Sequence, residues 1–207
     1  MIDWNHPENN DLLLYDGGAR FVVLDAVLFV NGIHFAVVEG VRPDREPTVG
    51  EAIADLRAYT GMRTAGERQD VRSFFAFVQV LIATNGKEAR VGTITSATEH
   101  FAPWRTVEPV KLEQVRVELG YDRHASLTQM ETVAAGVLRP LHLLDLVRNF
   151  SAFHQIEDRT VKIVERYQQF RVVHRMIKSL LDGRTRAQME HALRRHISEQ
   201  RPGNPAY

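Results

Sequence analysis

The fold follows from residues Asp25 to Glu39, which read Asp-Ala-Val-Leu-Phe-Val-Asn-Gly-Ile-His-Phe-Ala-Val-Val-Glu. Around it, residues 19–30 and 33–41 are rich in β-branched and aromatic side chains, and Asn31-Gly32 is a typical sequence for a tight turn between strands. We therefore predict a β-hairpin in which each strand contains one acidic residue. Carboxylates rarely lie within apolar strands unless they are paired or bind a cation.

The register of this hairpin decides whether the two carboxylates meet. In a strict two-residue turn residue 30 pairs with residue 33, so the numbers of any two paired residues add to 63. Asp25 and Glu39 then lie on opposite faces of the hairpin. A three-residue loop over 31–33 with a bulge makes them add to 64, so that the two acids lie opposite each other with Cβ atoms about 4.5–5.5 Å apart. Carboxylates this close repel unless one is protonated or a divalent cation, Mg²⁺ or Mn²⁺ for oxygen ligands, lies between them. Alternatively, both acids lie at strand ends, exposed or paired with arginines such as Arg20 and Arg42.

The segments that follow the hairpin complete a β-β-α-β-β pattern. We predict a helix that begins at a capping box of Thr48 and Glu51 and ends at Gly61. A buried strand over 77–84 and a returning strand over 88–95 come next. The apolar positions expected to face the core from the helix are Ala52, Ile53, Leu56 and Tyr59. This order predicts an α/β (α+β) fold, a mixed sheet with a flanking helix.

We predict that the α/β core spans residues 1–108. Beyond it, the spacing of apolar residues along the sequence changes twice. Polar residues predict a connector over 109–126, and a helical period predicts an all-helical segment over 127–207. Two apolar stripes define the predicted helices, and a last helix begins near Thr185. The stripes comprise Val133, Val137, Leu138, Leu141 and Leu144, and then Ile163, Tyr167, Phe170, Ile177 and Leu181.

Composition excludes several classes of protein. The absence of cysteine excludes disulfides, thiolate zinc sites and a cysteine nucleophile, and it favours a reducing, cytoplasmic location. No run of 18 apolar residues is present and the first residues do not form a signal peptide, so no membrane association is expected. Of 26 basic and 26 acidic residues, 11 and 4 lie in residues 159–207, which leaves 15 and 22 in residues 1–158. This basic C-terminal part contacts nucleic acid or docks on the acidic remainder.

The frame around Asp25 and Glu39 resembles the N-terminal nuclease domain of the R (HsdR) subunit of type I restriction enzymes, a PD-(D/E)xK nuclease. Further segments follow in the order of that family, and the resemblance extends over residues 5–181. These segments are 7–11, 51–59, 83–92, 101–106, 144–150 and 166–170. The resemblance implies a restriction-endonuclease-like sheet in 1–108 and Mg²⁺-dependent cleavage of double-stranded DNA in the restriction of foreign DNA.

In that family the Asp and the Glu hold Mg²⁺ (or Mn²⁺), so the resemblance assigns metal binding to Asp25 and Glu39. It also assigns a supporting role to Tyr59, which lies on the helix with the family's QxxxY motif. The family has a lysine two residues after the Glu, on the same face of the strand, which helps to activate water and to stabilise the charged phosphate.

The sequence departs from the family pattern at several positions. Val41 replaces the lysine, Asp55 replaces the glutamine of QxxxY, and Leu24 replaces a proline. The loss of one such transition-state contact costs on the order of 2.7–4 kcal/mol, a factor of about 10²–10³ in rate. We therefore expect cleavage to be weak or lost. Arg42 is predicted to point to the other face, which leaves Lys87 as the candidate replacement for the missing charge.

The resemblance also sets expectations about partners. In the family the helical part leads to an ATP-driven motor, but this sequence has no GxxxxGK[ST] loop, so we expect a form truncated before the motor, without ATP-driven translocation. Gln169 resembles a glutamine that contacts adenine and is expected to be vestigial, and the family's helical segment before residue 1 is expected to be missing. Expected partners are double-stranded DNA and the methyltransferase and specificity subunits. The alternatives are a non-catalytic module that binds those subunits, or a decayed gene fragment.

Overall fold

The computed structural model describes residues 12–15, 21–42, 49–61, 72–183 and 186–199. The chain divides into two compact units, Met1–Tyr167 and Gln168–Tyr207. Within the described residues no helix is both long enough and apolar enough to cross a lipid bilayer.

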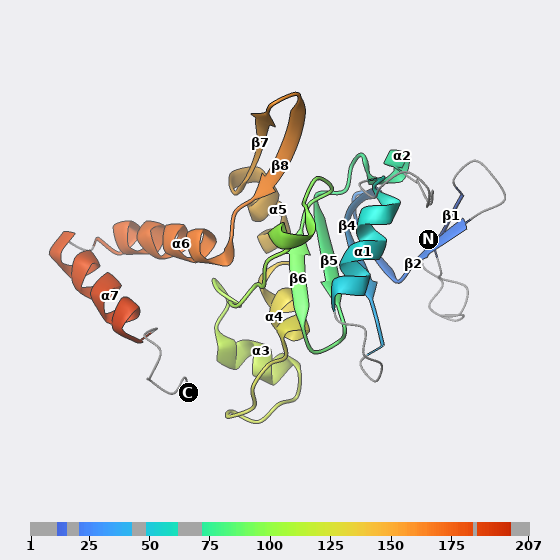
Figure 1. Cartoon of the computed structure of the whole chain (residues 1–207). Helices are drawn as coiled ribbons and strands as arrows, with labels where there is room; N and C mark the ends of the chain where they lie inside the picture. Colours follow the sequence, from blue (N-terminus) through green and yellow to red (C-terminus); the bar gives the residue numbers. More distant parts are fainter. Residues whose placement is uncertain (1–11, 16–20, 43–48, 62–71, 184–185, 200–207) are drawn as a thin grey trace. The chain divides into compact units, whose positions relative to one another are not determined.

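A four-stranded mixed sheet forms the centre of the first unit (Figure 1). Its order is β3-β4-β5-β6, in which β4 and β5 are parallel and the two outer pairs are antiparallel. The strands are β3 (Ala26–Val30), β4 (Ile33–Gly40), β5 (Val80–Thr84) and β6 (Ala89–Gly92). Helix α1 (Val49–Tyr59) and the short α2 (Arg72–Phe75) connect the two parallel strands. The predicted β-β-α-β-β order and the mixed α/β fold class are confirmed.

The segment predicted as one strand over 19–30 is divided at Asp25. Before it, β2 (Phe21–Leu24) pairs with β1 (Leu12–Tyr15), and after it β3 pairs with β4. Leu24 is only 2% exposed and belongs to the core. The change of partner at Asp25 leaves that residue outside both strands, at the junction of two hairpins.

The β3–β4 hairpin combines features of the two predicted registers. Asn31 and Gly32 have positive φ angles of 50° and 82°, as a two-residue type I′ turn requires. Paired residue numbers add to 63 beside the turn, but the register shifts so that Leu28 pairs with Ala36, and the sum beyond is 64. The extra residue is Phe35. A bulge within the strand, rather than a longer loop, therefore produces the register that directs Asp25 toward Glu39.

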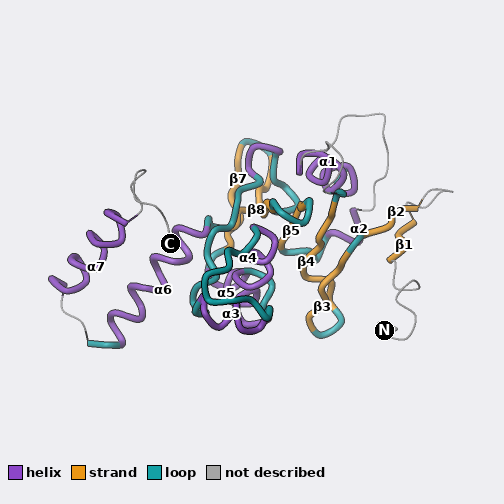
Figure 2. Tube along the Cα trace, turned by 90° about the horizontal axis from the view of Figure 1, so that it is seen from below, coloured by secondary structure: helices purple, strands orange, loops and turns teal. Residues whose placement is uncertain are grey.

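Helix α1 lies against β4 and β5, on one face of the sheet (Figure 2). Its residues Ala52, Ile53, Leu56 and Tyr59 are buried as predicted, in one cluster with Val37, Leu81 and Ala83 of the sheet. The predicted end of the helix is also confirmed, because Gly61 has a φ of 70° and its N–H donates to the carbonyl of Ala58. Thr48, the predicted cap, lies outside the described residues.

The C-terminal half differs from the expectation in two places. Helix α3 (Leu112–Glu118) lies within the predicted connector over 109–126, and an antiparallel hairpin, β7 (Ser151–Ile156) and β8 (Arg159–Val164), interrupts the part predicted to be all-helical. Ile163 therefore lies in a strand. The β-branched run Thr160-Val161 and Ile163-Val164 suits a strand, and Glu157 has the positive φ, 52°, of a tight turn.

The first predicted apolar stripe is divided between two helices, α4 (Gln129–Gly136) and α5 (Pro140–Asn149). Pro140 begins the second helix and changes which of its side chains face inward. Leu143 and Leu146 are buried, whereas Leu141 and Leu144 are 80% and 41% exposed. The stripe prediction was wrong at these two leucines because it continued one helical period across a break.

The second unit is helical, with α6 (Tyr167–Leu181) and α7 (Arg186–Glu199). Gly183 follows α6 with a φ of 67°, and Thr185 lies outside the described residues. Several apolar side chains of α6 are exposed: Val172, Val173, Met176, Ile177, Leu180 and Leu181.

Candidate functional site

Asp25 is held next to Glu39 by a hydrogen bond to the backbone of β4. The N–H of Gly40 donates a hydrogen bond to Oδ2 of Asp25 at 2.6 Å. Gly40 also permits the close approach, because a Cβ at this position would lie only 3.2 Å from that oxygen. The carboxylate of Asp25 is thus fixed at the residue that follows Glu39.

Glu39 points into the interface between the sheet and α1. The residues two positions before and after it, Val37 on β4 and Val41 just beyond the end of β4, pack in or against the core cluster that includes α1. The side chain is only 7% exposed, and the hydroxyl of Tyr59 donates to its Oε1 at 3.3 Å. Its other oxygen, Oε2, is buried and has no hydrogen-bond partner among the described residues. An unsatisfied carboxylate oxygen in the interior is costly unless a proton or a ligand occupies it.

The electrostatic environment of Glu39 disfavours its charged form. Burial, followed by the negative charges of Asp25 and Asp55, raises the pKa of Glu39 from 4.5 to about 8, against the opposing hydrogen bonds from Tyr59 and from the backbone of Asp25. Burial and the neighbouring Glu39 also raise the pKa of Tyr59 well above its ordinary value, so this hydroxyl remains a donor. Without a bound cation, Glu39 is therefore mostly protonated at neutral pH.

Asp55, at the family's glutamine position, is half-buried one helical turn before Tyr59 on α1. Its charge acts on Glu39, so it belongs to the same group of side chains. Sequence reasoning treated Asp55 only as a departure from the motif. The i, i+4 spacing to Tyr59 was the available signal that both side chains share one face of the helix.

The structure also shows the surroundings of Val41, which replaces the family's lysine, and of Arg42 and Lys87, the nearby basic residues. Val41 is half-buried in the core cluster, and its N–H donates to the carbonyl of Thr84 at 2.9 Å. Arg42 and Lys87 are exposed, and within the described residues neither makes a hydrogen bond or ion pair with Asp25 or Glu39. Gln169, the other predicted site residue, is exposed on α6 of the second unit.

The donor set fits a hard divalent cation in its chemistry. Asp25 and Glu39 offer carboxylate oxygens only, and a cation would satisfy Oε2 of Glu39, which no described residue contacts by a hydrogen bond. In the described part of the chain, no group of three or more His, Cys, Asp or Glu side chains is arranged to hold a metal ion. A cation at this place would therefore have two protein carboxylates, with water and substrate oxygens completing its shell.

Residues 1–100 match the family described as type I restriction enzyme R protein N terminus. The chain is also 26% identical over 204 residues to a putative type I restriction enzyme MjaIXP endonuclease subunit of Methanocaldococcus jannaschii. It is 26% identical over 191 residues to the type I restriction enzyme HindI endonuclease subunit of Haemophilus influenzae. These matches cover 89% and 87% of this chain but only 18% and 16% of the two relatives. The predicted resemblance is confirmed, and the chain spans less than a fifth of the length of these relatives.

Proposed function

We propose that this chain binds double-stranded DNA at a nuclease-type site in which Asp25 and Glu39 hold Mg²⁺ or Mn²⁺. The proposal follows from the match of residues 1–100 to the family of type I restriction R-protein N termini. The observation that supports this most is the buried Oε2 of Glu39, which has no hydrogen-bond partner among the described residues and lies near the charges of Asp25 and Asp55. A carboxylate with a purely structural role is paired with a basic side chain or accepts hydrogen bonds at both oxygens. A carboxylate that binds a metal ion instead needs an oxygen without such a partner.

The bound cation would polarise the scissile phosphate and lower the pKa of an attacking water. Glu39 loses its proton when it becomes a ligand, Tyr59 holds Oε1, and the N–H of Gly40 holds Asp25. Val41 supplies neither a charge nor a proton to the phosphate. We propose that cleavage is therefore weak or absent, with DNA binding retained.

Titration calorimetry with Mn²⁺ tests the metal site directly. The wild-type chain should bind Mn²⁺, and Glu39→Ala should weaken binding at least about tenfold, the range for removal of a ligand or its support. Glu51→Ala is the matched control, because Glu51 is an exposed carboxylate in the first turn of α1. A wild-type chain without measurable affinity, or equal losses in both variants, contradicts the proposal.

A plasmid-nicking assay with Mg²⁺ and Mn²⁺ tests the cleavage expectation. The wild type should cut weakly or not at all, whereas Val41→Lys, with or without Asp55→Gln, should gain cutting by about 10²–10³. The gain should disappear when Asp25→Ala is added. Robust wild-type cutting that Asp25→Ala abolishes would show that the chain is an active nuclease without the motif lysine.

A second candidate function is a non-catalytic module that binds the methyltransferase and specificity subunits. The exposed apolar side chains of α6, among them Met176, Leu180 and Leu181, favour an interaction surface on the second unit. Co-purification with those subunits that is lost in Leu180→Glu and kept in Glu39→Ala would support it. No co-purification of the wild type would argue against it.

A further inference from the structure

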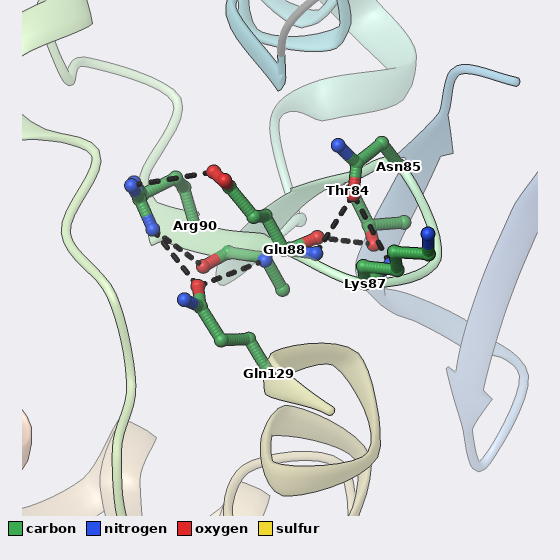
Figure 3. A network of polar contacts seen from close by, with 7 residues as sticks. Thr84, Asn85, Lys87, Glu88, Arg90 and Gln129 are labelled. Atoms are coloured by element: carbon green, nitrogen blue, oxygen red, sulfur yellow. Dashed lines mark hydrogen bonds and ion pairs between the residues drawn. The ribbon is translucent and has the colours of Figure 1, made fainter. Parts of the chain in front are cut away.

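The connection between β5 and β6 is a rigid turn over residues 85–88. Oδ1 of Asn85 accepts from the N–H groups of Lys87 at 3.1 Å and Glu88 at 2.7 Å. Oγ1 of Thr84 accepts from the N–H of Gly86 at 2.9 Å and donates to the carbonyl of Glu88 at 2.7 Å. Gly86 has a φ of 83°, which a residue with a Cβ rarely adopts. The backbone of the turn is therefore closed by its own side chains (Figure 3).

Helix α4 fixes the same turn from outside. The N–H of Gln129 donates to the carbonyl of Lys87 at 2.8 Å. Oε1 of Gln129 accepts from the N–H of Ala89 at 3.3 Å and from Nη1 of Arg90 at 2.9 Å. Both backbone groups of Lys87 are thus bonded, while its side chain is exposed and takes part in none of these bonds (Figure 3). The turn presents an ammonium group on a fixed backbone.

This turn lies at the edge of the sheet that carries the candidate site. Gly40 is the register partner of Thr84, and the N–H of Val41 donates to the carbonyl of Thr84. Because β4 and β5 are parallel, their carboxyl ends share one edge. The turn therefore starts beside Val41, the position without the lysine, and beside Gly40, which holds Asp25.

We propose that Lys87 contacts a phosphate of the DNA bound at the site of Asp25 and Glu39, in place of the charge that Val41 lacks. The inference rests on the proposed function and adds a residue to it. The site itself is acidic, since Asp25 and Asp55 both act on Glu39, so a polyanion needs a cationic contact there in addition to a metal ion. Arg90 is already paired with Glu88 at 3.6 Å and with Gln129, whereas in the described part of the chain the ammonium of Lys87 has no such partner.

Fluorescence anisotropy with a labelled DNA duplex, measured at several salt concentrations with Ca²⁺ as the cation, tests the contact. Lys87→Gln should weaken binding about threefold to tenfold and lower the slope of log affinity against log salt by about one, as expected for one lost phosphate contact. Lys111→Gln is the control, because Lys111 is an exposed lysine at the start of α3. It should leave the slope unchanged.

The double variant Lys87→Gln with Val41→Lys moves the positive charge to the residue that follows β4. It should restore the slope of log affinity against log salt. A wild-type chain that does not bind the duplex, or a Lys87→Gln variant with the wild-type slope, overturns the inference. The Mn²⁺ titration separates this failure from that of the metal site. Lys87→Gln should bind Mn²⁺ like the wild type, and loss of Mn²⁺ binding in the wild type would refute the proposed function itself.

Discussion

Two buried ionisable groups in the first unit, Glu39 and Lys162, are accommodated in opposite ways. Lys162, on β8, is 4% exposed, and its N–H donates to Oγ1 of Thr95 at 2.8 Å. Its carbonyl accepts from Oγ1 of Thr93 at 2.8 Å, and its ammonium donates to Oε1 of Gln79 and lies 5.7 Å from the centre of the Phe153 ring. All of these partners are uncharged, and burial alone lowers the pKa of Lys162 to about 8.

Glu39 is buried to a similar degree, but its polar atoms have fewer hydrogen-bond partners. One oxygen is held by Tyr59, the other has no partner among the described residues, and the nearby charges have the same sign. Lys162 attaches the β7–β8 hairpin to the residues that flank β5 and β6, with every polar group of the residue bonded. The difference is in keeping with the proposal that Glu39 binds a ligand, whereas the environment of Lys162 serves packing.

Glu39 should cause the greatest change that we predict, a decline in the free energy of unfolding as the pH rises. Its folded pKa of about 8 lies above the ordinary 4.5, so the metal-free native state binds a proton that the unfolded chain releases between these values. This contribution is complete below pH 4.5 and is lost as the pH rises through 8. The free energy of unfolding should therefore fall by about 2–4 kcal/mol across the window. Urea unfolding in EDTA measures it.

Glu39→Gln keeps the shape of the side chain and should remove this decline. Glu51→Gln, at an exposed position on α1, should retain it. Equal pH profiles for the wild type and Glu39→Gln would show that Glu39 is not the titrating group, and the comparison with Lys162 would then fail.

Lys162 should produce a smaller change of opposite sign. Its folded pKa of about 8 lies below the ordinary 10.5, so the unfolded chain binds the additional proton in this window. Stability should be lowest at and below pH 8 and should rise by about 2–3 kcal/mol toward pH 10.5. With Glu39, this predicts a minimum of stability near pH 8 in the metal-free chain.

Lys162→Met replaces the buried ammonium by an apolar side chain of similar length. It should abolish the rise above pH 8 in the same urea experiment, and Lys111→Met, at an exposed lysine, should not. A large loss of stability at pH 7 in Lys162→Met would instead show that the bond to Gln79 outweighs the cost of burial.

The contrast between the two groups also shows what the sequence could predict. The β3–β4 hairpin, the buried face of α1 and its end at Gly61 follow from local rules, namely a turn dipeptide, a helical period and a glycine C-terminus. The pair Asp25 and Glu39 was singled out because two carboxylates interrupt apolar strands and match a family pattern, whereas local rules left the register of the hairpin open. The bulge at Phe35, which sets that register, lies within the strand and has no signal of its own in the sequence.

Interactions between distant segments were not accessible. The bonds of Lys162 join residues 67 to 83 positions apart. The β-branched residues of the run Thr160–Val164 were a local signal for a strand, but the prediction continued a helical period across them. The helical reading of Ile163 failed for this reason. The role of Gly40 was missed too, because a glycine at a strand end has many explanations until the oxygen of Asp25 is seen beside it.

Metal binding should depend on pH through Glu39 but not through Lys162. We expect Mn²⁺ to displace the proton of Glu39, so its apparent affinity should rise about fiftyfold between pH 6 and pH 8, in proportion to the deprotonated fraction at a pKa of about 8. Titration calorimetry across this range measures the change. Lys162→Met should give the same profile as the wild type, and a pH-independent affinity would contradict the shift of Glu39.

The weakest change that we predict concerns the hydrogen bond from Tyr59 to Glu39. Tyr59→Phe removes a donor that lowers the pKa of Glu39, so the pKa should rise further and Mn²⁺ binding at pH 7 should weaken by about twofold to tenfold. The loss should shrink above pH 9, where Glu39 is charged in both proteins. Tyr121→Phe is the matched control, because Tyr121 also donates to a glutamate, Glu131, at 2.5 Å, but at the surface. If Tyr59→Phe weakens binding equally at every pH, Tyr59 acts by packing α1 against the sheet rather than through the proton of Glu39.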